Sequence, residues 1–212
     1  MPLPLAHPAA VLPLRRFCPH PWSFPALVIS SLSPDLGYVF APLRVAEFSH
    51  RCLVGSRGFC LPVGLALMVL LHLIRRPVVR LLPGRHRLAL LPLCQRPPGR
   101  PIQIMASLIV GAWTHILLDS ATHSEGWVVE HISILRGSLP GLGGRRVEVF
   151  DFLYYAATFG GVVWLAGTYL AWLTRVSGSA GLGRRAGDWI WPVLLGIAVT
   201  IVAAASRGPA RW

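Results

Sequence analysis

Three residues with metal-binding side chains follow one another at a spacing of four: His115, Asp119 and His123. Each step of four along an α-helix advances the side chain by only about 40° around the axis, so all three share one face. Imidazole nitrogens and carboxylate oxygens are ligands for zinc, manganese and non-haem iron. The spacing therefore predicts that one helix supplies several ligands to a divalent metal ion, with zinc as the expected metal.

The position of this segment in the chain supports the metal hypothesis. His115 and Asp119 come at the end of an apolar run, residues 104–118, where a buried ionisable group usually serves an ion, a partner or a reaction. Two simpler interpretations stay open. The side chains of His115 and Asp119 could hydrogen-bond each other, and His123 could lie in solvent beyond the end of the helix.

Other titratable residues are weaker candidates when each is taken alone. Asp35 follows Ser-Pro and could be a turn residue that bonds its own backbone. His50 precedes an apolar block and could be an interfacial histidine, while His7 stands before a proline and could cap a short helix. Arginine-rich or proline-rich surroundings indicate solvated side chains for His20, His72 and His86. A pair close to His123 could form a second layer around it: Glu130 and His131.

Four long apolar blocks must position these side chains: residues 59–74, 104–118, 152–173 and 189–205. As a helix, the first block would rise about 24 Å, short of the roughly 30 Å hydrocarbon layer, so it needs its flanks to span. Aromatic residues at the ends of the last two blocks fit the membrane interfaces. The expected fold class is all-α, a polytopic helical membrane protein with about four transmembrane helices and short N-terminal helices.

The composition also favours a membrane protein. All 20 basic residues are arginines, the formal net charge is +12, and 54% of the residues are hydrophobic. The arginines lie between the apolar blocks instead of forming one stripe, which argues against a nucleic-acid partner. Two arginine-rich segments, residues 75–101 and 175–187, are expected to be loops in water. Ten arginines fall on each side of a four-span topology, so the positive-inside rule leaves the orientation open.

The first 58 residues contain nine of the 19 prolines, which excludes long helices there. Short helices can start at Pro8, or at Pro25 behind Ser23 as a cap. A turn is expected at residues 33–37, and a further helix could begin near Val45 and run through His50 into the first span. We interpret residues 1–212 as a single domain, in which 1–58 carries part of the polar site and 59–205 carries the spans.

Several motifs together resemble a bacterial membrane family, catalogued as domain of unknown function 4184. The resemblance extends over most of the chain and rests on Leu5-Ala6-His7-Pro8, Ser33-Pro34-Asp35, Glu47-Phe48-Ser49-His50, Trp113-Thr114-His115, and Asp119 with Thr122-His123. More distantly, their order is similar to that in predicted membrane-bound metal-dependent hydrolases and in zinc-dependent phospholipase C. The resemblance implies a helical membrane protein and, through the wider group, a hydrolase.

Carried over residue by residue, the resemblance implies one metal site made of His7, Asp35, His50, His115, Asp119 and His123. Arg51 and Arg57 depart from the more apolar approach to the first span that the family pattern leads us to expect. Their presence leaves the start of that span open. Arg57 could instead face a headgroup phosphate.

Two function classes follow from this site. The first is a metal-dependent hydrolase in the cell membrane, acting on a lipid-borne phosphoester, with membrane lipids as partners and Asp35 or Asp119 as ligand or general base. The second is a non-catalytic membrane protein, either a scaffold or a carrier whose buried His and Asp conduct protons or a metal ion. Four spans without a repeat argue against a transporter, although a homo-oligomer could compensate.

Overall fold

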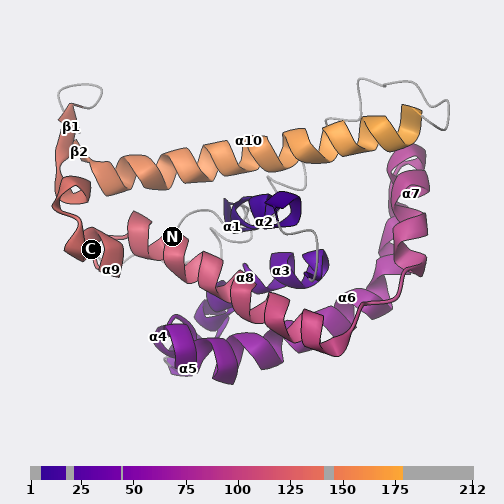
Figure 1. The fold of residues 1–212 in the computed structure, drawn as a ribbon, viewed down its shortest axis with the longest axis horizontal. Coiled ribbons are helices and arrows are strands. Elements are labelled where there is room, and N and C mark those ends of the chain that lie inside the picture. The colour runs from indigo at the N-terminus through magenta and orange to yellow at the C-terminus, as the bar shows by residue number, and fades with distance from the viewer. Residues whose placement is uncertain (1–5, 18–21, 44, 141–145, 179–212) are drawn as a thin grey trace.

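The computed structural model describes residues 6–17, 22–43, 45–140 and 146–178 (Figure 1). In these ranges the chain is mostly helical, with turns and short extended segments between the helices and one antiparallel strand pair, in which Ser138 pairs with Glu148. The elements, in chain order, are α1 Ala6–Ala10, α2 Leu12–Phe17, α3 Phe24–Ser30, η1 Pro34–Leu43, α4 Val45–Ser49, α5 Cys52–Gly55, η2 Ser56–Cys60, α6 Leu61–Leu81, α7 Gly84–Leu90, η3 Leu91–Gln95, α8 Pro101–Thr122, α9 Trp127–His131, η4 Ser133–Arg136, β1 Ser138–Pro140, β2 Arg146–Glu148 and α10 Val149–Gly178.

Three helices are long and apolar enough to cross a membrane: Cys52–Leu81, Pro101–Thr122 and Val149–Ser177. They contain the blocks 59–74, 104–118 and 152–173, so a helix long and apolar enough to span is confirmed at each of these three positions. The fourth, 189–205, lies outside the described residues. Large apolar side chains on the three helices are exposed to the surroundings, as contact with lipid requires, among them Val69, Leu117 and Val163.

The predicted loop at residues 75–101 is mostly helical, so that expectation was wrong. The first long helix continues to Leu81, α7 and η3 extend the helical structure to Gln95, and an extended segment then leads into α8. A proline stands just before α7, in the first turn of η3 and at the start of α8, positions where a missing N–H costs nothing. The continuation gives the first span 30 residues, about 45 Å of helix, which solves its shortage of length. Of the second predicted loop, 175–187, the first residues continue α10 to Gly178 and the rest lies outside the described residues.

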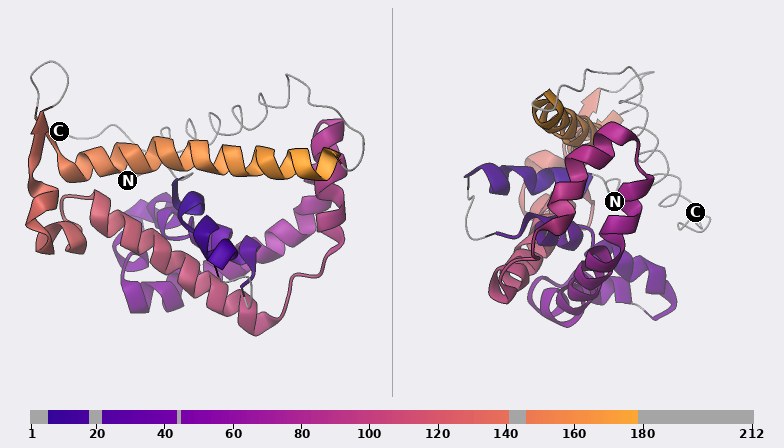
Figure 2. Two further views of the ribbon diagram at one scale, coloured as in Figure 1. Left: turned by 45° about the horizontal axis from the view of Figure 1, so that its top comes forward. Right: turned by 90° about the vertical axis from the view of Figure 1, so that its right-hand side faces the viewer.

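The short N-terminal helices lie between the long helices. In Figure 1, α10 runs across one side of the molecule, α8 and α6 run along the other, and α1 to α3 fill the space between them. The turned view on the left of Figure 2 shows the same indigo helices beneath α10. Accordingly, α1 packs against α10 and α8, while α3 packs against α8 and α6. The expected short helix behind Ser23 is confirmed as α3, with a proline in its first turn.

Glycines allow the close approach of these helices. A Cβ on Gly111 would come 2.5 Å from the carbonyl oxygen of Leu27, and one on Gly161 would come 3.0 Å from the Cα of Ala6. Small residues at helix contacts are typical of membrane helices, since lipid provides no hydrophobic driving force between them. Two serines add polar contacts between α3 and α8. Ser30 Oγ donates to Leu108 O, and the Ser23 N–H donates to Ser107 Oγ at 2.8 Å.

The helix is interrupted at His50, where the sequence predicted a continuous helix into the first span. α4 ends at Ser49, Arg51 adopts an extended conformation with ψ 115°, and α5 starts at Cys52. At this interruption α4 packs closely against α5. The contact requires glycine at position 55, because a Cβ there would lie 2.2 Å from the carbonyl oxygen of Phe48. His50 therefore sits in a turn between two helices instead of on a helix surface.

His86 also differs from its predicted solvated role. Its side chain is buried, and its Nδ1 lies 2.6 Å from the hydroxyl of Tyr169 on α10. Beside this hydrogen bond, Ala89 of α7 packs with Leu170 and Leu173 of α10. These contacts hold α7, which follows the first span, against the C-terminal part of α10.

The contact between α10 and α1 can be tested with two neighbouring glycines. Gly161→Leu is expected to destabilise the protein by about 1–3 kcal/mol, because the added side chain overpacks against the α1 backbone. Gly160→Leu is the matched control, since a Cβ there meets no atom within 4 Å. Thermal unfolding of both variants in one detergent, followed by circular dichroism, measures the difference. Equal midpoints would contradict the close approach of α1 and α10.

Candidate metal centre

The last turns of α8 carry the helical part of the predicted site. His115 and Asp119 lie on its buried face, and the His115 Nε2 is 3.2 Å from the Asp119 Oδ2. His123 follows the last helical residue, and its Nδ1–H donates to the backbone oxygen of Asp119 at 2.9 Å. The same Nδ1 is 3.9 Å from the Asp119 Oδ1. His115 and His123 therefore both lie near the Asp119 carboxylate, but His123 is beyond the end of the helix and in an extended conformation, so only His115 and Asp119 share the predicted helix face.

Asp35 reaches the site from the start of η1. Its Oδ1 lies 3.7 Å from the Nε2 of His115. The segment between α3 and η1 also fixes the His115 ring, because the Nδ1–H of His115 donates to the carbonyl oxygen of Ser31 at 2.7 Å. Nδ1 is the protonated nitrogen in that hydrogen bond, so Nε2 presents its lone pair to the two carboxylates.

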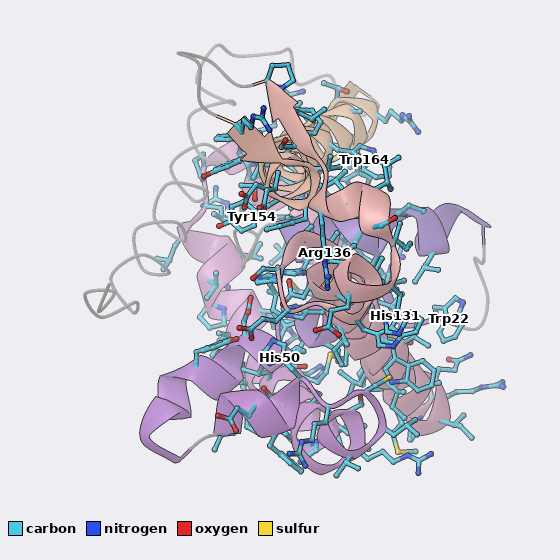
Figure 3. The ribbon with its side chains drawn as sticks, turned by 90° about the vertical axis from the view of Figure 1, so that its left-hand side faces the viewer. Trp22, His50, His131, Arg136, Tyr154 and Trp164 are labelled. Atoms are coloured by element: carbon cyan, nitrogen blue, oxygen red, sulfur yellow. The ribbon has the colours of Figure 1, made fainter. Side chains whose placement is uncertain are left out.

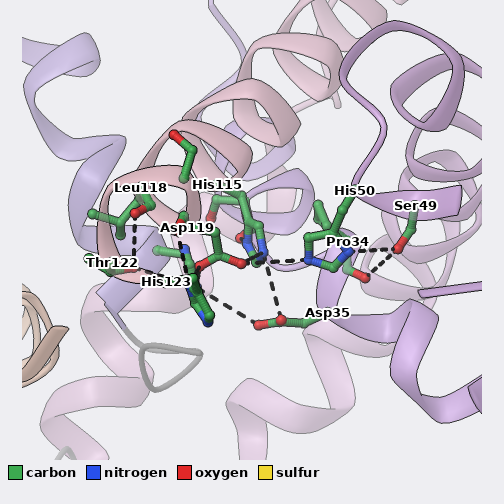
Figure 4. Close-up of polar contacts among 12 residues, drawn as sticks. Pro34, Asp35, Ser49, His50, His115, Leu118, Asp119, Thr122 and His123 are labelled. Carbon is green, nitrogen blue, oxygen red and sulfur yellow. Dashed lines mark hydrogen bonds and ion pairs between the residues drawn. The ribbon is translucent and has the colours of Figure 1, made fainter. Parts of the chain in front are cut away.

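His50 enters from the turn between α4 and α5. Its Nε2 lies 3.6 Å from the same Asp119 Oδ2 that faces His115 (Figure 4). On the other side of the ring, Nδ1 lies 3.2 Å from the Oγ of Ser49, which donates to the carbonyl oxygen of Pro34 at 3.0 Å. Ser49 is thus placed to accept a hydrogen bond from the His50 Nδ1–H, which favours the tautomer with a lone pair on Nε2.

His7 lies inside α1 and is fully buried. Its ring stacks on that of His115 with centroids 3.7 Å apart, and its Nε2 is 3.7 Å from Asp119 Oδ1 and 3.9 Å from Asp35 Oδ2. Burial, aided by the neighbouring His115, holds the pKa of His7 well below its usual value, so the ring is neutral at pH 7. Burial is also the main cause that raises the pKa of Asp35.

The structure brings all six predicted residues together. Four of them offer ligand atoms within 4.8 Å of one another, and this group could hold a metal ion: Asp35, His50, His115 and Asp119. His7 and His123 border the group, each close to an oxygen of Asp119. The six side chains come from α1, η1, the α4–α5 turn and the end of α8.

The separations in the cluster are those of ligand atoms around a cation. The nitrogen–oxygen distances between the imidazoles and the two carboxylates run from 3.2 to 3.9 Å. Charge-assisted hydrogen bonds are shorter, about 2.7–2.9 Å. Two atoms bound at about 2.1 Å to one tetrahedral zinc ion lie roughly 3.4 Å apart. Along the described parts of the chain, neither carboxylate forms an ion pair with an arginine, so no cationic side chain neutralises the two.

Two predicted neighbours do not join the cluster. Glu130 and His131 are exposed on α9, where the His131 Nδ1–H donates to the backbone of Trp127 and its ring stacks on that indole. The interpretation of this pair as a second layer was therefore wrong. The sequence carries no signal for the hydrogen bonds that the carbonyl oxygens of Ser31 and Pro34 accept in the site. The role of Ser49 was also missed, and its position next to His50 was the one available clue.

The helical fold, the three helices able to cross a membrane and the histidine–aspartate cluster define a helical membrane protein with a candidate metal centre. A family model described as Domain of unknown function (DUF4184) matches residues 1–208, and the chain belongs to this family. Among curated proteins and among solved structures, no match was found. The resemblance to this family is thereby confirmed, while the likeness to membrane-bound hydrolases stays a prediction.

The support of His50 by Ser49 predicts an effect on metal affinity. Ser49→Ala is expected to weaken binding of added Zn²⁺ by ten- to a hundredfold, the usual effect of losing a group that orients a histidine ligand. Ser31→Ala is the matched control: this serine is also fully buried, and it holds His115 through its backbone oxygen, which the substitution keeps. Titration of both variants with Zn²⁺ in detergent measures the difference. Equal affinities would show that Ser49 does not orient His50.

Proposed function

We propose that the protein is a metal-dependent hydrolase of the cell membrane that cleaves a phosphoester bond of a membrane lipid, with zinc as its metal. The observation that carries this proposal is the pair of largely buried carboxylates, Asp35 and Asp119, which face imidazole Nε2 atoms at ligand spacing and have no arginine partner among the described residues. Buried charges are ordinarily paired or bind a metal.

The donor set suits a catalytic zinc ion. His50, His115 and Asp119 converge on one point, since both Nε2 atoms face the same Asp119 oxygen. Two histidines and one carboxylate are a known ligand set of zinc hydrolases, which keep a further coordination position for water or substrate. A cation held there would lower the pKa of a bound water towards about 7 and polarise the phosphoryl oxygen.

Asp35 is placed to act as the general base in this scheme. It faces His115 from the start of η1, and its pKa, raised by burial, suits proton transfer. The attacking water forms a bond to phosphorus, its proton passes to Asp35, and the ester P–O bond breaks. The leaving oxygen takes a proton from solvent at the open edge, where the side chains of His50 and His123 are 22% and 33% exposed.

The location of the cluster favours a substrate that arrives from the bilayer. The site lies where the helix Cys52–Leu81 begins, where α8 ends and where the first turns of α10 bring Tyr154 near His123. Figure 3 looks at the molecule from this end and shows His50 on the α4 side and Tyr154 on the α10 side. The exposed Arg51 and Arg57, at the start of the first span, could bind an anionic headgroup.

The proposal treats residues 1–212 as one catalytic domain. His7, Asp35 and His50 come from the proline-rich N-terminal region, and the other three site residues come from the end of α8. Neither region holds the cluster alone, because Asp119 contacts histidines from both. Separation of the two regions would therefore remove the site.

The proposed reaction can be tested with purified protein in lipid vesicles. Vesicles of phosphatidic acid, phosphatidylglycerol and phosphatidylethanolamine, which offer both monoester and diester bonds, should release inorganic phosphate or a water-soluble headgroup product, and a chelator should stop the release. His115→Ala and Asp35→Asn are expected to lower the rate at least a hundredfold, as loss of a metal ligand and of a base would. His131→Ala, an exposed histidine outside the cluster, is the matched control.

Two results would contradict the hydrolase. One is lipid turnover that persists with the chelator and in His115→Ala. The other is a protein that leaves the lipids intact but carries Zn²⁺ or protons across sealed vesicles, which would favour the carrier.

A further inference from the structure

The two oxygens of each carboxylate in the cluster face different histidines. Asp119 Oδ2 lies near His50 and His115, at 3.6 and 3.2 Å, whereas Asp119 Oδ1 lies near His7 and His123, at 3.7 and 3.9 Å. Asp35 divides in the same way, with Oδ1 3.7 Å from His115 and Oδ2 3.9 Å from His7. A single cation between His50, His115 and Asp119 uses only one side of this arrangement.

His7 is the residue that a single ion leaves unexplained. Its side chain is fully buried, and neither of its ring nitrogens has a hydrogen-bond partner within the described parts of the chain. Buried polar atoms without partners are rare in folded proteins and call for a specific cause. The His7 Nε2 faces two carboxylate oxygens that are themselves without hydrogen-bond partners, Asp35 Oδ2 and Asp119 Oδ1. These three atoms together form an unused set of ligands.

The stacking of His7 on His115 shows why one ion does not serve both rings. The two rings are nearly parallel, at 22°, with centroids 3.7 Å apart, and both present Nε2 to the same two carboxylates. A ligand's lone pair lies in the plane of its ring, so two nearly parallel rings direct their lone pairs side by side instead of towards one point. Cations in two-metal sites are about 3.5–4 Å apart, which matches the ring separation.

We propose that the cluster holds two divalent cations, the second bound by His7 Nε2, Asp35 Oδ2 and Asp119 Oδ1, with His123 at its rim. This inference rests on the proposed function for the first cation, and in it the Asp119 carboxylate bridges the two metals, with Oδ2 towards the first and Oδ1 towards the second. Asp35 Oδ1 still faces the His115 side, where the base is needed.

Two cations also define the class of substrate. Two divalent ions with two carboxylates and neutral imidazoles leave a net charge of +2, whereas one ion with the same carboxylates is neutral. A buried charge of that size requires a counter-anion. A phosphate monoester dianion that bridges both metals would balance it, so we assign the site to lipids that end in a monoester phosphate. Inorganic phosphate should bind in the same way.

Metal stoichiometry tests the proposal without reference to activity. The wild-type protein in detergent, dialysed against Zn²⁺ or Mn²⁺, should bind two ions per chain, and His7→Ala should bind one, with the affinity of the first ion changed less than about fivefold. Mn²⁺-loaded wild type should give the electron paramagnetic resonance spectrum of an exchange-coupled pair, and His7→Ala that of an isolated ion. Inorganic phosphate should raise the affinity for the second Mn²⁺ at least tenfold in the wild type. His72→Ala, an exposed histidine on α6, is the matched control.

The outcomes separate this inference from the proposed function. One ion per chain with an uncoupled Mn²⁺ spectrum in the wild type would overturn the second site, even if lipid hydrolysis is observed. Two coupled ions without lipid hydrolysis would support the second site and count against the hydrolase. If His7→Ala does not fold, the wild-type stoichiometry and spectrum still decide, and His7→Gln provides a milder variant. Phosphate that leaves the Mn²⁺ affinity unchanged would overturn the assignment to phosphate monoesters.

Discussion

The burial of two carboxylates among imidazoles is the constraint around which the described structure is organised. Asp35 and Asp119 lie within about 4 Å of histidine nitrogens, and neither has an arginine partner within the part of the chain that the structure describes. An isolated ionised carboxylate is very costly to remove from water, and its usual compensation is a paired charge or a metal. A cation bound in the cluster would compensate for this cost. If the proposed metal binds, it would contribute to folding as well as to chemistry, because the elements that carry the six residues are far apart in the chain.

The N-terminal region and the glycines of the long helices act together to build this cluster. α3 approaches α8 so closely at Gly111 that the carbonyl oxygen of Ser31 reaches His115, which fixes the tautomer of that ring. At Gly161, α10 admits α1 in the same way, and α1 carries His7 onto the face of His115. The outer faces of the long helices remain apolar, so the polar atoms are directed inward, as lipid surroundings demand. Gly111, Gly161 and the backbone of Ser31 thus set the positions of His7 and His115.

The periodicity of the sequence predicted the parts of the site that belong to a single helix. It could not predict which separate segments of the chain lie close together in space. The shared face of His115 and Asp119 follows from a spacing of four, and three apolar blocks were long enough to be recognised as spans. The break after Ser49 was missed because it depends on the contact between Gly55 and the Phe48 backbone, which has no local signal. The burial of His86 was missed for a similar reason, since its arginine-rich neighbours conceal a contact with Tyr169, 83 residues away. The motifs shared with the family, by contrast, predicted from sequence that His7, Asp35 and His50 belong to the same site as the residues of α8.

The use of short, proline-rich helices between long spans has a geometric cause. One helix can present ligands at a spacing of four only within a narrow arc, so α8 alone approaches a cation from a single direction. A four-coordinate ion needs donors from directions that surround it. Prolines prevent the first 50 residues from forming a span, and the helices described there have ten residues or fewer; of these, α1, α3 and η1 pack against α8. His7 arrives over the face of His115, Asp35 from the start of η1 and His50 from a turn, so the proline-rich region supplies the directions that a bundle of long helices lacks.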